Sequence, residues 1–279
     1  MSRPSTETDS SVRAPFARIL CGVDGSRGSK RAVDLALALA GTDAAVHLLA
    51  VCHVRGAGPT RMAELGRDRA EEALRAARLH ARTAGIRAST ELLDDPDPRR
   101  ALLQAARSHD LLVLGTHGHS RAEGILLGGT ATLALHACEV PVLVARAVPE
   151  GRALGERVIV ASDGSPGIRR VAEVAGAIAA RAGGHTMLLH VTELDRHEVR
   201  RELAQEATDL FLATGTEPVV SSVSGRPADA IVAAAAEHEA TLLMLGSRGL
   251  GGMRALGSVS ERVGAAAHCP VLVLRPGLR

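Results

Sequence analysis

Short apolar runs alternate with longer stretches of mixed character along the whole chain. Runs such as LLVLG at 111–115 and PVLVL at 270–274 are apolar at every position rather than at alternate positions. Strands that are buried on both faces have this pattern, so it predicts a parallel sheet covered by helices. The expected strands are Ile19–Val23, Val46–Val51, Ala88–Leu93, Leu111–Gly115, Val140–Ala145, Val158–Ser162, Thr186–Val191, Pro218–Val223, Leu242–Gly246 and Val271–Leu274.

The stretches between these runs predict helices. Asp97 and Pro98 form a good helix start, because a capping side chain precedes a proline at the first turn. The alternating order of strands and helices requires right-handed crossovers and predicts an α/β fold with two doubly wound domains. The expected helices are Ser29–Ala40, Arg61–Ala84, Pro98–Arg107, Thr130–Ala137, Ile168–Arg181, Arg196–Ala213, Ala228–Glu237 and Ser258–Ala267.

The chain repeats itself once over nearly its whole length. Residues 19–41 read ILCGVDGSRGSKRAVDLALALAG and match VIVASDGSPGIRRVAEVAG at 158–176, while residues 111–144 match 242–273. Each repeat is far longer than a solenoid unit, which indicates two copies of a whole domain. We expect a disordered tail at 1–15, a first domain at 16–146, a linker at 147–156 and a second domain at 157–279.

Composition narrows the class of protein. A length of 279 residues accommodates two domains, and 46% hydrophobic and 23% charged residues are ordinary for a globular protein. A net charge of +2 does not favour a nucleic-acid or membrane surface. No apolar run approaches the roughly 20 residues of a membrane helix, and residues 1–15 are too polar for a secretion signal. We expect a cytoplasmic protein with reduced thiols and no zinc site, because Cys21, Cys52, Cys138 and Cys269 form no CxxC pair and no metal-ligand spacing.

An aspartate directly follows the first predicted strand of each half, at Asp24 and Asp163. In open α/β sheets, ligands bind beyond the carboxyl ends of the strands, at the point where the strand order reverses. A carboxylate at that point accepts hydrogen bonds from an adenine amino group or a ribose hydroxyl. Asp-Gly-Ser is also a favoured turn that caps the following helix, and this alternative stays open. The recurrence of the motif, together with the glycines below, favours a ligand site.

Glycines follow the fourth predicted strand of each half. The first half has Gly115-Thr-His-Gly118, nine residues, and then Gly128-Gly129-Thr130 at a helix start. Glycines let backbone amides approach phosphate oxygens, and a helix N-terminus adds free N–H groups. This is neither a P-loop nor a dinucleotide turn, because no Lys-Ser/Thr follows at the needed spacing and the loop follows the fourth strand. The second half has Gly246-Ser-Arg-Gly249, seven residues, and then Gly257-Ser258-Val259.

The order VDGS, LxxV(C/L)HV, GTHG-x9-GG and a closing PVLV resembles a universal stress protein domain, present here as a tandem pair from about Arg18 to Arg275. The resemblance implies a five-stranded parallel sheet in each domain, and a family split between ATP-binding and non-binding members. In the binding members a G-x2-G-x9-G-(S/T) pattern holds the phosphates and the aspartate meets the nucleoside. Carried over, one site would comprise Asp24, Cys52, Gly115, Gly118, Gly128, Gly129 and Thr130, and the other Asp163, His190, Gly246, Gly249, Gly257, Ser258 and Val259.

Each copy departs from the pattern in a different place. The first has Gly129 where a serine or threonine is expected, with Thr130 one residue late, and the second loses two residues from its loop. We favour the first site, because a shorter loop reaches less far over a triphosphate. His117, His119 and Arg248 lie inside the loops, where they contact phosphate or face water. The Arg99-Arg100 pair is interpreted as a solvated helix face.

These patterns lead to a hypothesis of an ATP-binding regulatory module acting in a stress or dormancy response, with Mg²⁺ as a candidate companion ion. No general base or Walker-type lysine is evident, which favours binding over fast hydrolysis. The alternatives are an interaction protein of the same fold that binds no nucleotide, and a nucleotide-dependent enzyme such as an adenylyl transferase. As family members pair, we expect the halves to pack as a pseudo-dimer through Val140–Ala145 and Val271–Leu274, which leaves a homodimer of chains open.

Overall fold

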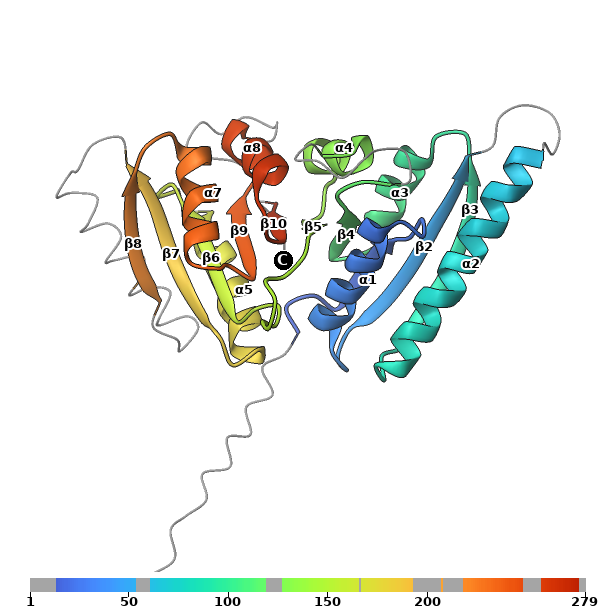
Figure 1. The fold of residues 1–279 in the computed structure, drawn as a ribbon, viewed down its shortest axis with the longest axis horizontal. Coiled ribbons are helices and arrows are strands. Elements are labelled where there is room, and N and C mark those ends of the chain that lie inside the picture. The colour runs from blue at the N-terminus through green and yellow to red at the C-terminus, as the bar shows by residue number, and fades with distance from the viewer. Residues whose placement is uncertain are drawn as a thin grey trace, which may run out of the picture.

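The computed structural model describes residues 14–53, 61–118, 127–165, 167–192, 207, 218–247 and 257–275. Strands and helices alternate in the first half and, apart from β7 and β8, among the described elements of the second (Figure 1). The first half contains β1 (Arg18–Gly22), α1 (Arg27–Ala40), β2 (Ala45–His53), α2 (Arg61–Thr83), β3 (Ala88–Asp95), α3 (Pro98–Ala106), β4 (Leu111–Gly115), α4 (Gly129–Ala137) and β5 (Val142–Ala145). The second contains β6 (Arg157–Ser162), α5 (Ile168–Arg181), β7 (His185–Thr192), β8 (Val219–Ser224), α7 (Pro227–Glu237), β9 (Leu242–Gly246), α8 (Ser258–Ala266) and β10 (Val271–Leu274).

The ten strands form one sheet in the order β3-β2-β1-β4-β5-β10-β9-β6-β7-β8. All neighbours within each half are parallel, which confirms the predicted doubly wound, five-stranded domains. At the centre, β5 pairs antiparallel with β10, and Leu143 lies opposite Leu272. The two halves therefore join through their last strands, as expected, and their sheets continue into each other.

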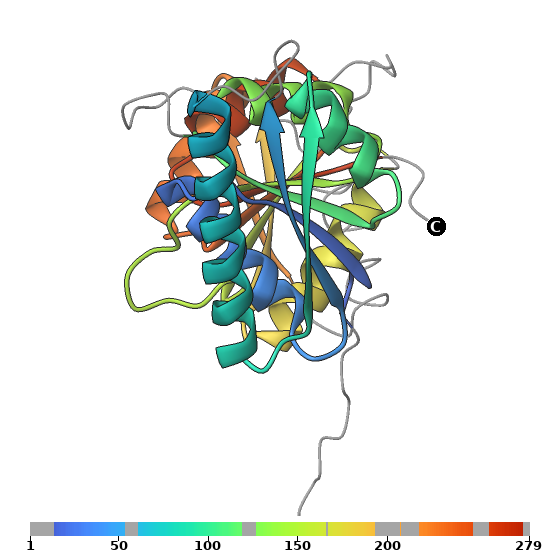
Figure 2. The ribbon, with the colours of Figure 1, turned by 90° about the vertical axis from the view of Figure 1, so that its right-hand side faces the viewer.

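Helices cover both faces of the sheet (Figures 1 and 2). Side chains from α1, α2 and α5 build the core on one face, and those from α3, α4, α7 and α8 build it on the other. Successive residues of β1 alternate between them, because Ile19 and Cys21 belong to the first cluster and Leu20 to the second. This burial on both faces explains why central strands such as β4, β5, β9 and β10 are apolar at every position. Each cluster contains residues of both halves, so the core is continuous across the chain.

Local signals set the helix starts. Asp97 accepts a hydrogen bond from the Arg100 N–H at 3.2 Å with Pro98 in the first turn, which confirms the predicted cap. Ser26 caps α1 in the same way, and the helix begins at Arg27 rather than Ser29. Strand β5 begins at Val142, two residues later than predicted, since Pro141 has no N–H to give to the ladder. The predicted helix at 196–213 lies almost entirely outside the described residues.

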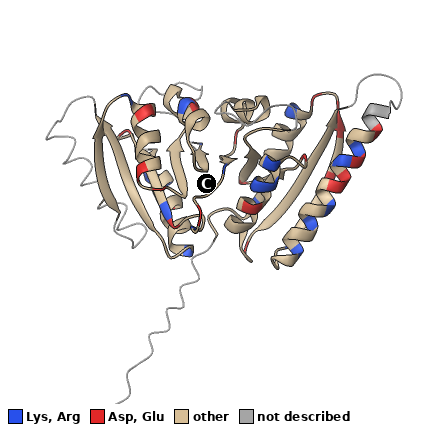
Figure 3. Cartoon of the chain, in the orientation of Figure 1, with Lys and Arg blue, Asp and Glu red and all other residues tan. Residues whose placement is uncertain are grey.

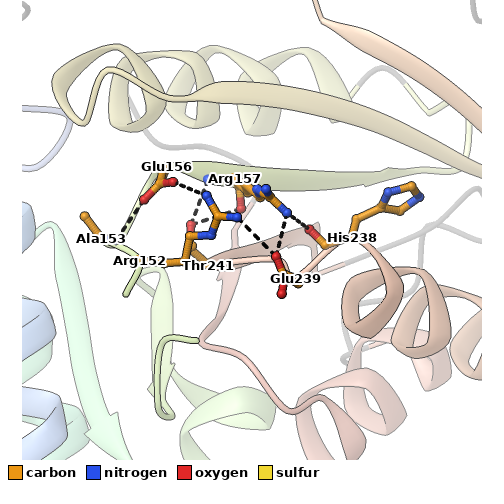
Figure 4. A network of polar contacts seen from close by, with 7 residues as sticks. All are labelled: Arg152, Ala153, Glu156, Arg157, His238, Glu239 and Thr241. Carbon is orange, nitrogen blue, oxygen red and sulfur yellow. Dashed lines mark hydrogen bonds and ion pairs between the residues drawn. The ribbon is translucent and has the colours of Figure 1, made fainter. Parts of the chain in front are cut away.

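Residues between β5 and β6, where the sequence predicts a linker, are bound to the second half (Figure 4). Arg152 pairs with Glu156 at 2.5 Å and with Glu239, beyond the end of α7, at 3.2 Å. Glu239 also pairs with Arg157 at 2.9 Å, at the start of β6. The hydrogen bond from Arg152 holds the pKa of the Glu156 carboxyl below its ordinary value. The segment is thus held against α7 by a network of ion pairs.

The described residues carry charges of both signs and four thiols. Basic and acidic residues are interspersed along α2 (Figure 3). No described helix is long and apolar enough to cross a membrane, and the described side chains include no His/Cys/carboxylate group that could hold a metal. All four cysteines are free thiols, and burial raises the pKa of Cys269 to about 11. Such a thiol stays protonated at neutral pH, which makes it unreactive.

Candidate nucleotide site

A cavity of about 910 Å³ opens in the first half, beyond the carboxyl ends of β1 and β4. From β1 the chain crosses to β2 on one side, while β4 lies on the other side, so the strand order reverses between β1 and β4. Open α/β sheets place their ligand sites at such a switch point. The cavity is lined by Gly22, Val23, Asp24, Ser29, Leu49, Val51, Pro98, Arg99, Leu102, Leu114, Gly115, Thr116, His117, Gly118, Leu127, Gly128, Gly129, Thr130, Ala131, Thr132, Leu133 and His136.

Asp24 serves the turn after β1 and also lines the cavity. Its Oδ1 accepts a hydrogen bond from the Ser26 N–H at 2.9 Å, across Gly25 with a φ of 82°. This is the turn that the sequence alternative predicts. The other oxygen, Oδ2, faces Gly118, since a Cβ added to that glycine would lie 2.7 Å from it. The turn thereby fixes the carboxylate beside the glycine loop, so the structural and ligand roles are compatible.

Two of the loop glycines are required by contacts within the protein. A Cβ on Gly115 would lie 2.5 Å from the Gly28 carbonyl carbon, because the end of β4 touches the first turn of α1. A Cβ on Gly128 would lie 2.9 Å from the Thr116 carbonyl oxygen, to which the Gly128 N–H donates at 2.7 Å. Phosphate access is therefore not the sole reason for glycine at positions 115 and 128. Gly28, the α1 residue that Gly115 contacts, was not among the residues that the sequence suggested.

The first turn of α4 faces the cavity together with an arginine of α3. Gly128 is the N-cap and makes no side-chain capping bond, and Gly129 and Thr130 open the helix. Free N–H groups and the positive end of the helix dipole favour an anion there. The Arg99 guanidinium lies against Gly129, within 3.0–3.1 Å of where a Cβ would sit. Arg99 is exposed, as the sequence predicts for a solvated helix face, and it also lines the cavity.

Cys52 is a carried-over residue that the structure places away from the cavity. Leu49 and Val51 of β2 line it, whereas Cys52 has the opposite parity on the strand. Asp94 and Arg67 influence the pKa of the Cys52 thiol, which burial raises. These are residues of β3 and α2, the helix on the other face of the sheet. The Cys52 side chain therefore lies on the opposite face of β2 from the cavity-lining residues Leu49 and Val51.

Two histidines complete the lining. His117 accepts a hydrogen bond at its main-chain carbonyl from the Ser26 hydroxyl at 3.2 Å, which ties the glycine loop to the cap of α1. His136 of α4, which the sequence did not suggest, pairs at 3.2 Å with Glu261 of α8. Since Glu261 belongs to the second half, the cavity wall extends to the contact between the halves. His119 lies outside the described residues.

The second half repeats the framework of the site. Asp163 Oδ1 accepts from the Ser165 N–H at 3.0 Å, and the Gly257 N–H donates to the Ser247 carbonyl at 2.9 Å. Ser260 binds the Gly246 carbonyl at 2.8 Å, while Ser258 opens α8. Val259 packs against the core, and His190 has a buried Nδ1 with no partner among the described residues. Arg248 and Gly249 lie outside the described residues.

Comparison with known proteins agrees with this architecture. The model of the universal stress protein family matches residues 15–146 and again 155–275, so the chain belongs to this family as a tandem of two domains. A universal stress protein of Mycolicibacterium smegmatis is 30% identical over 210 residues, 70% of this chain and 71% of that protein. The crystal structure of a universal stress protein from Archaeoglobus fulgidus is 27% identical and covers 95% of this chain and 97% of its own, with a TM-score of 0.75.

Some structures of the family contain an adenine nucleotide. A universal stress protein in complex with cAMP is 30% identical, with a TM-score of 0.38. It covers 43% of this chain and 95% of its own, which is the length of a single domain.

Proposed function

We propose that the first half binds an adenine nucleotide, ATP, and that the protein acts as a regulatory module in a stress or dormancy response in the cytoplasm. The observation that carries the proposal is the cavity at the switch point, whose 910 Å³ lies within the range of small-molecule sites. One side holds a carboxylate, and the other holds a helix N-terminus with a guanidinium. A nucleotide has the matching distribution, with hydrogen-bond donors on its nucleoside and negative charge on its phosphates.

The lining residues divide into two groups with different tasks. Asp24 accepts hydrogen bonds from the ribose hydroxyls or the adenine amino group, while Leu49 and Val51 offer apolar surface to the base. The N–H groups of Gly129 and Thr130 and the Thr130 hydroxyl donate to phosphate oxygens. A Mg²⁺ ion that arrives with ATP would be held by the phosphates rather than by a protein cage, as is usual for this ion.

Binding rather than turnover follows from the donor set. The single lysine of the chain, Lys30, is not among the residues that line the cavity. Transfer or hydrolysis of a phosphoryl group depends on charge stabilisation and on a residue that orients the nucleophile. We expect hydrolysis to be slow at most, with the effect of ATP lying in conformation or in partner binding.

The first experiment is an ultraviolet spectrum of the purified protein, followed by denaturation and chromatography of released small molecules. The chain contains no Trp and no Tyr, so adenine absorption near 260 nm stands out. We expect ATP or ADP in stoichiometric amount, or binding when ATP is added to protein that was purified empty. Protein that is empty and stays empty in the presence of ATP would contradict the proposal.

An interaction module without nucleotide is the second candidate, and a specific observation favours it. Gly115 and Gly128 are required by backbone contacts, so a domain that lost its ligand would still keep both glycines. Under this alternative the two halves present a surface to a partner independently of ATP. A partner captured equally well with and without ATP, by protein that binds no nucleotide, would support it.

A further inference from the structure

The Arg99 side chain lies face-on against the first residue of α4. A Cβ built on Gly129 would be 3.0 Å from the guanidinium carbon, 3.0 Å from Nη2 and 3.1 Å from Nη1. Nearly equal distances to these three atoms place the flat face of the group, not its N–H edge, over Gly129. The N–H donors lie in the guanidinium plane, so this stacking leaves them available for an anion at the helix N-terminus.

Arg99 also differs in pairing from other arginines of the protein. Arg67, Arg107 and Arg152 each form an ion pair with a carboxylate. Arg99 has no hydrogen bond or ion pair to any residue that the structure describes, although it lines a cavity that contains Asp24. The other titratable groups of the lining are His117 and His136, the latter paired with Glu261. An available cation thus stands where the helix dipole already favours negative charge.

The second half of the chain provides an internal comparison. Pro98 opens α3 and Pro227 opens α7, so Arg99 corresponds to Ala228, whose side chain is buried. Gly129, the residue after the N-cap of α4, corresponds to Ser258 in α8. The arginine therefore occurs with a glycine and the alanine with a serine. This pairing agrees with the geometry, because a Cβ at position 129 would require the guanidinium to shift by a few tenths of an ångström.

We propose that Arg99 sets the phosphate specificity of the first site: its guanidinium, seated over Gly129, binds the terminal phosphates and selects nucleoside di- and triphosphates over monophosphates. This inference rests on the proposed nucleotide function. In this role Arg99 compensates for the serine or threonine that is missing at position 129, because a charged guanidinium with two N–H donors replaces a neutral hydroxyl. Hydrogen bonds from a charged donor are about twice as strong as neutral ones, and a guanidinium reaches oxygens further from the helix.

The test measures the dissociation constants of ATP, ADP and AMP for the full chain and its variants by titration calorimetry. The number of nucleotides bound per chain shows whether one half binds or both do. We expect Arg99→Ala to weaken ATP by about 10- to 100-fold, the value of a charge-assisted hydrogen bond, and AMP by less than about threefold. Arg100→Ala is the matched control, because it removes the same charge from the next residue of α3, which does not line the cavity. This control should leave all three constants within about twofold.

Substitutions at both positions test whether Arg99 and Gly129 act together. Gly129→Ser alone should weaken ATP because its Cβ displaces Arg99, whereas Gly129→Ser combined with Arg99→Ala should recover part of the lost affinity through the new hydroxyl. Equal losses for ATP and AMP in Arg99→Ala, or equal effects of Arg99→Ala and Arg100→Ala, would overturn the role of Arg99 and leave nucleotide binding intact. Wild-type protein that binds none of the three nucleotides would instead overturn the proposed function and this inference with it.

Discussion

Arg146 and Arg275 make the same contact in opposite directions across the centre of the molecule. Arg146 follows β5 and donates from Nη2 to the carbonyls of Gly264 and Ala265 in α8, at 2.6 and 3.1 Å. Arg275 follows β10 and donates to the carbonyls of Ala134 and Leu135 in α4. Each arginine therefore binds the C-terminal turn of a helix in the other half, where the helix dipole favours a cation.

This reciprocal contact predicts that the halves unfold together. We expect Arg146→Ala to lower the free energy of unfolding by about 1.5–3 kcal/mol, because a largely buried guanidinium leaves helix carbonyls without a donor. Burial lowers the pKa of Arg146 to about 10, so the group is still charged at neutral pH. Urea titration followed by circular dichroism measures the change. Arg107→Ala, which removes an exposed ion pair to Glu139, is the control and should cost under about 1 kcal/mol; equal losses would contradict the prediction.

Substitutions at two glycines of one loop should separate stability from binding. Gly115→Ala drives a Cβ into the backbone of α1, so we expect a loss of about 1–3 kcal/mol of stability. Among the described residues, a Cβ at position 118 meets only the Asp24 carboxylate, so Gly118→Val should keep the melting temperature while abolishing nucleotide binding in the first half. Thermal melts and ATP titrations check both variants.

A third glycine is the control for these two. Gly66 in α2 has open space around it, and Gly66→Ala should raise stability by about 0.5–1 kcal/mol through helix propensity. If Gly118→Val binds ATP with unchanged affinity and stoichiometry, the assignment of the first site is wrong.

Asp24→Asn should divide the two roles of this residue. The amide oxygen still accepts from the Ser26 N–H, so the turn survives and stability should change by less than about 0.5 kcal/mol. Loss of the charged acceptor should weaken ATP by about tenfold. Asp24→Ala loses the turn as well, with about 0.5–1.5 kcal/mol of stability. Asp163→Ala is the matched control, because it removes the equivalent turn contact, to the Ser165 N–H, from the second half. Unchanged ATP affinity in Asp24→Asn would leave Asp24 a turn residue alone.

Acidification should weaken the network that holds the segment between the halves. The folded-state pKa of Glu156 lies below its ordinary value of 4.5, chiefly because Arg152 donates to it. The stabilisation is therefore fully present above that ordinary value and is lost as the pH falls through the folded pKa. We expect Glu156→Gln to lower the melting temperature at pH 7 and to match wild type near pH 3. A difference that persists at the lower pH would show that charge is not the cause.

Some features of the fold and site follow from local sequence and were predicted. The apolar runs identified the central strands of the sheet, because burial on both faces leaves a signal at each position, whereas the edge strands β3 and β8 are only partly buried. Asp97 and Pro98 marked the start of α3, since capping depends on neighbours within one turn. The internal repeat located Asp24 and the loop glycines at strand ends, and the structure places Asp24, Gly115, Gly118, Gly128, Gly129 and Thr130 around one cavity.

Tertiary structure alone decided the rest. The family resemblance names Cys52, whereas the structure places Val51 in the cavity lining, because the face of each strand residue depends on which helix covers it. Arg99 is an exposed helix residue, as predicted, and only the packing of α3 beside α4 brings its guanidinium onto Gly129. Sequence by itself determined the elements, their order, the duplication and the edge of the sheet that carries the site. The side chains that share the site were decided by contacts between residues distant in the chain, which no local pattern records.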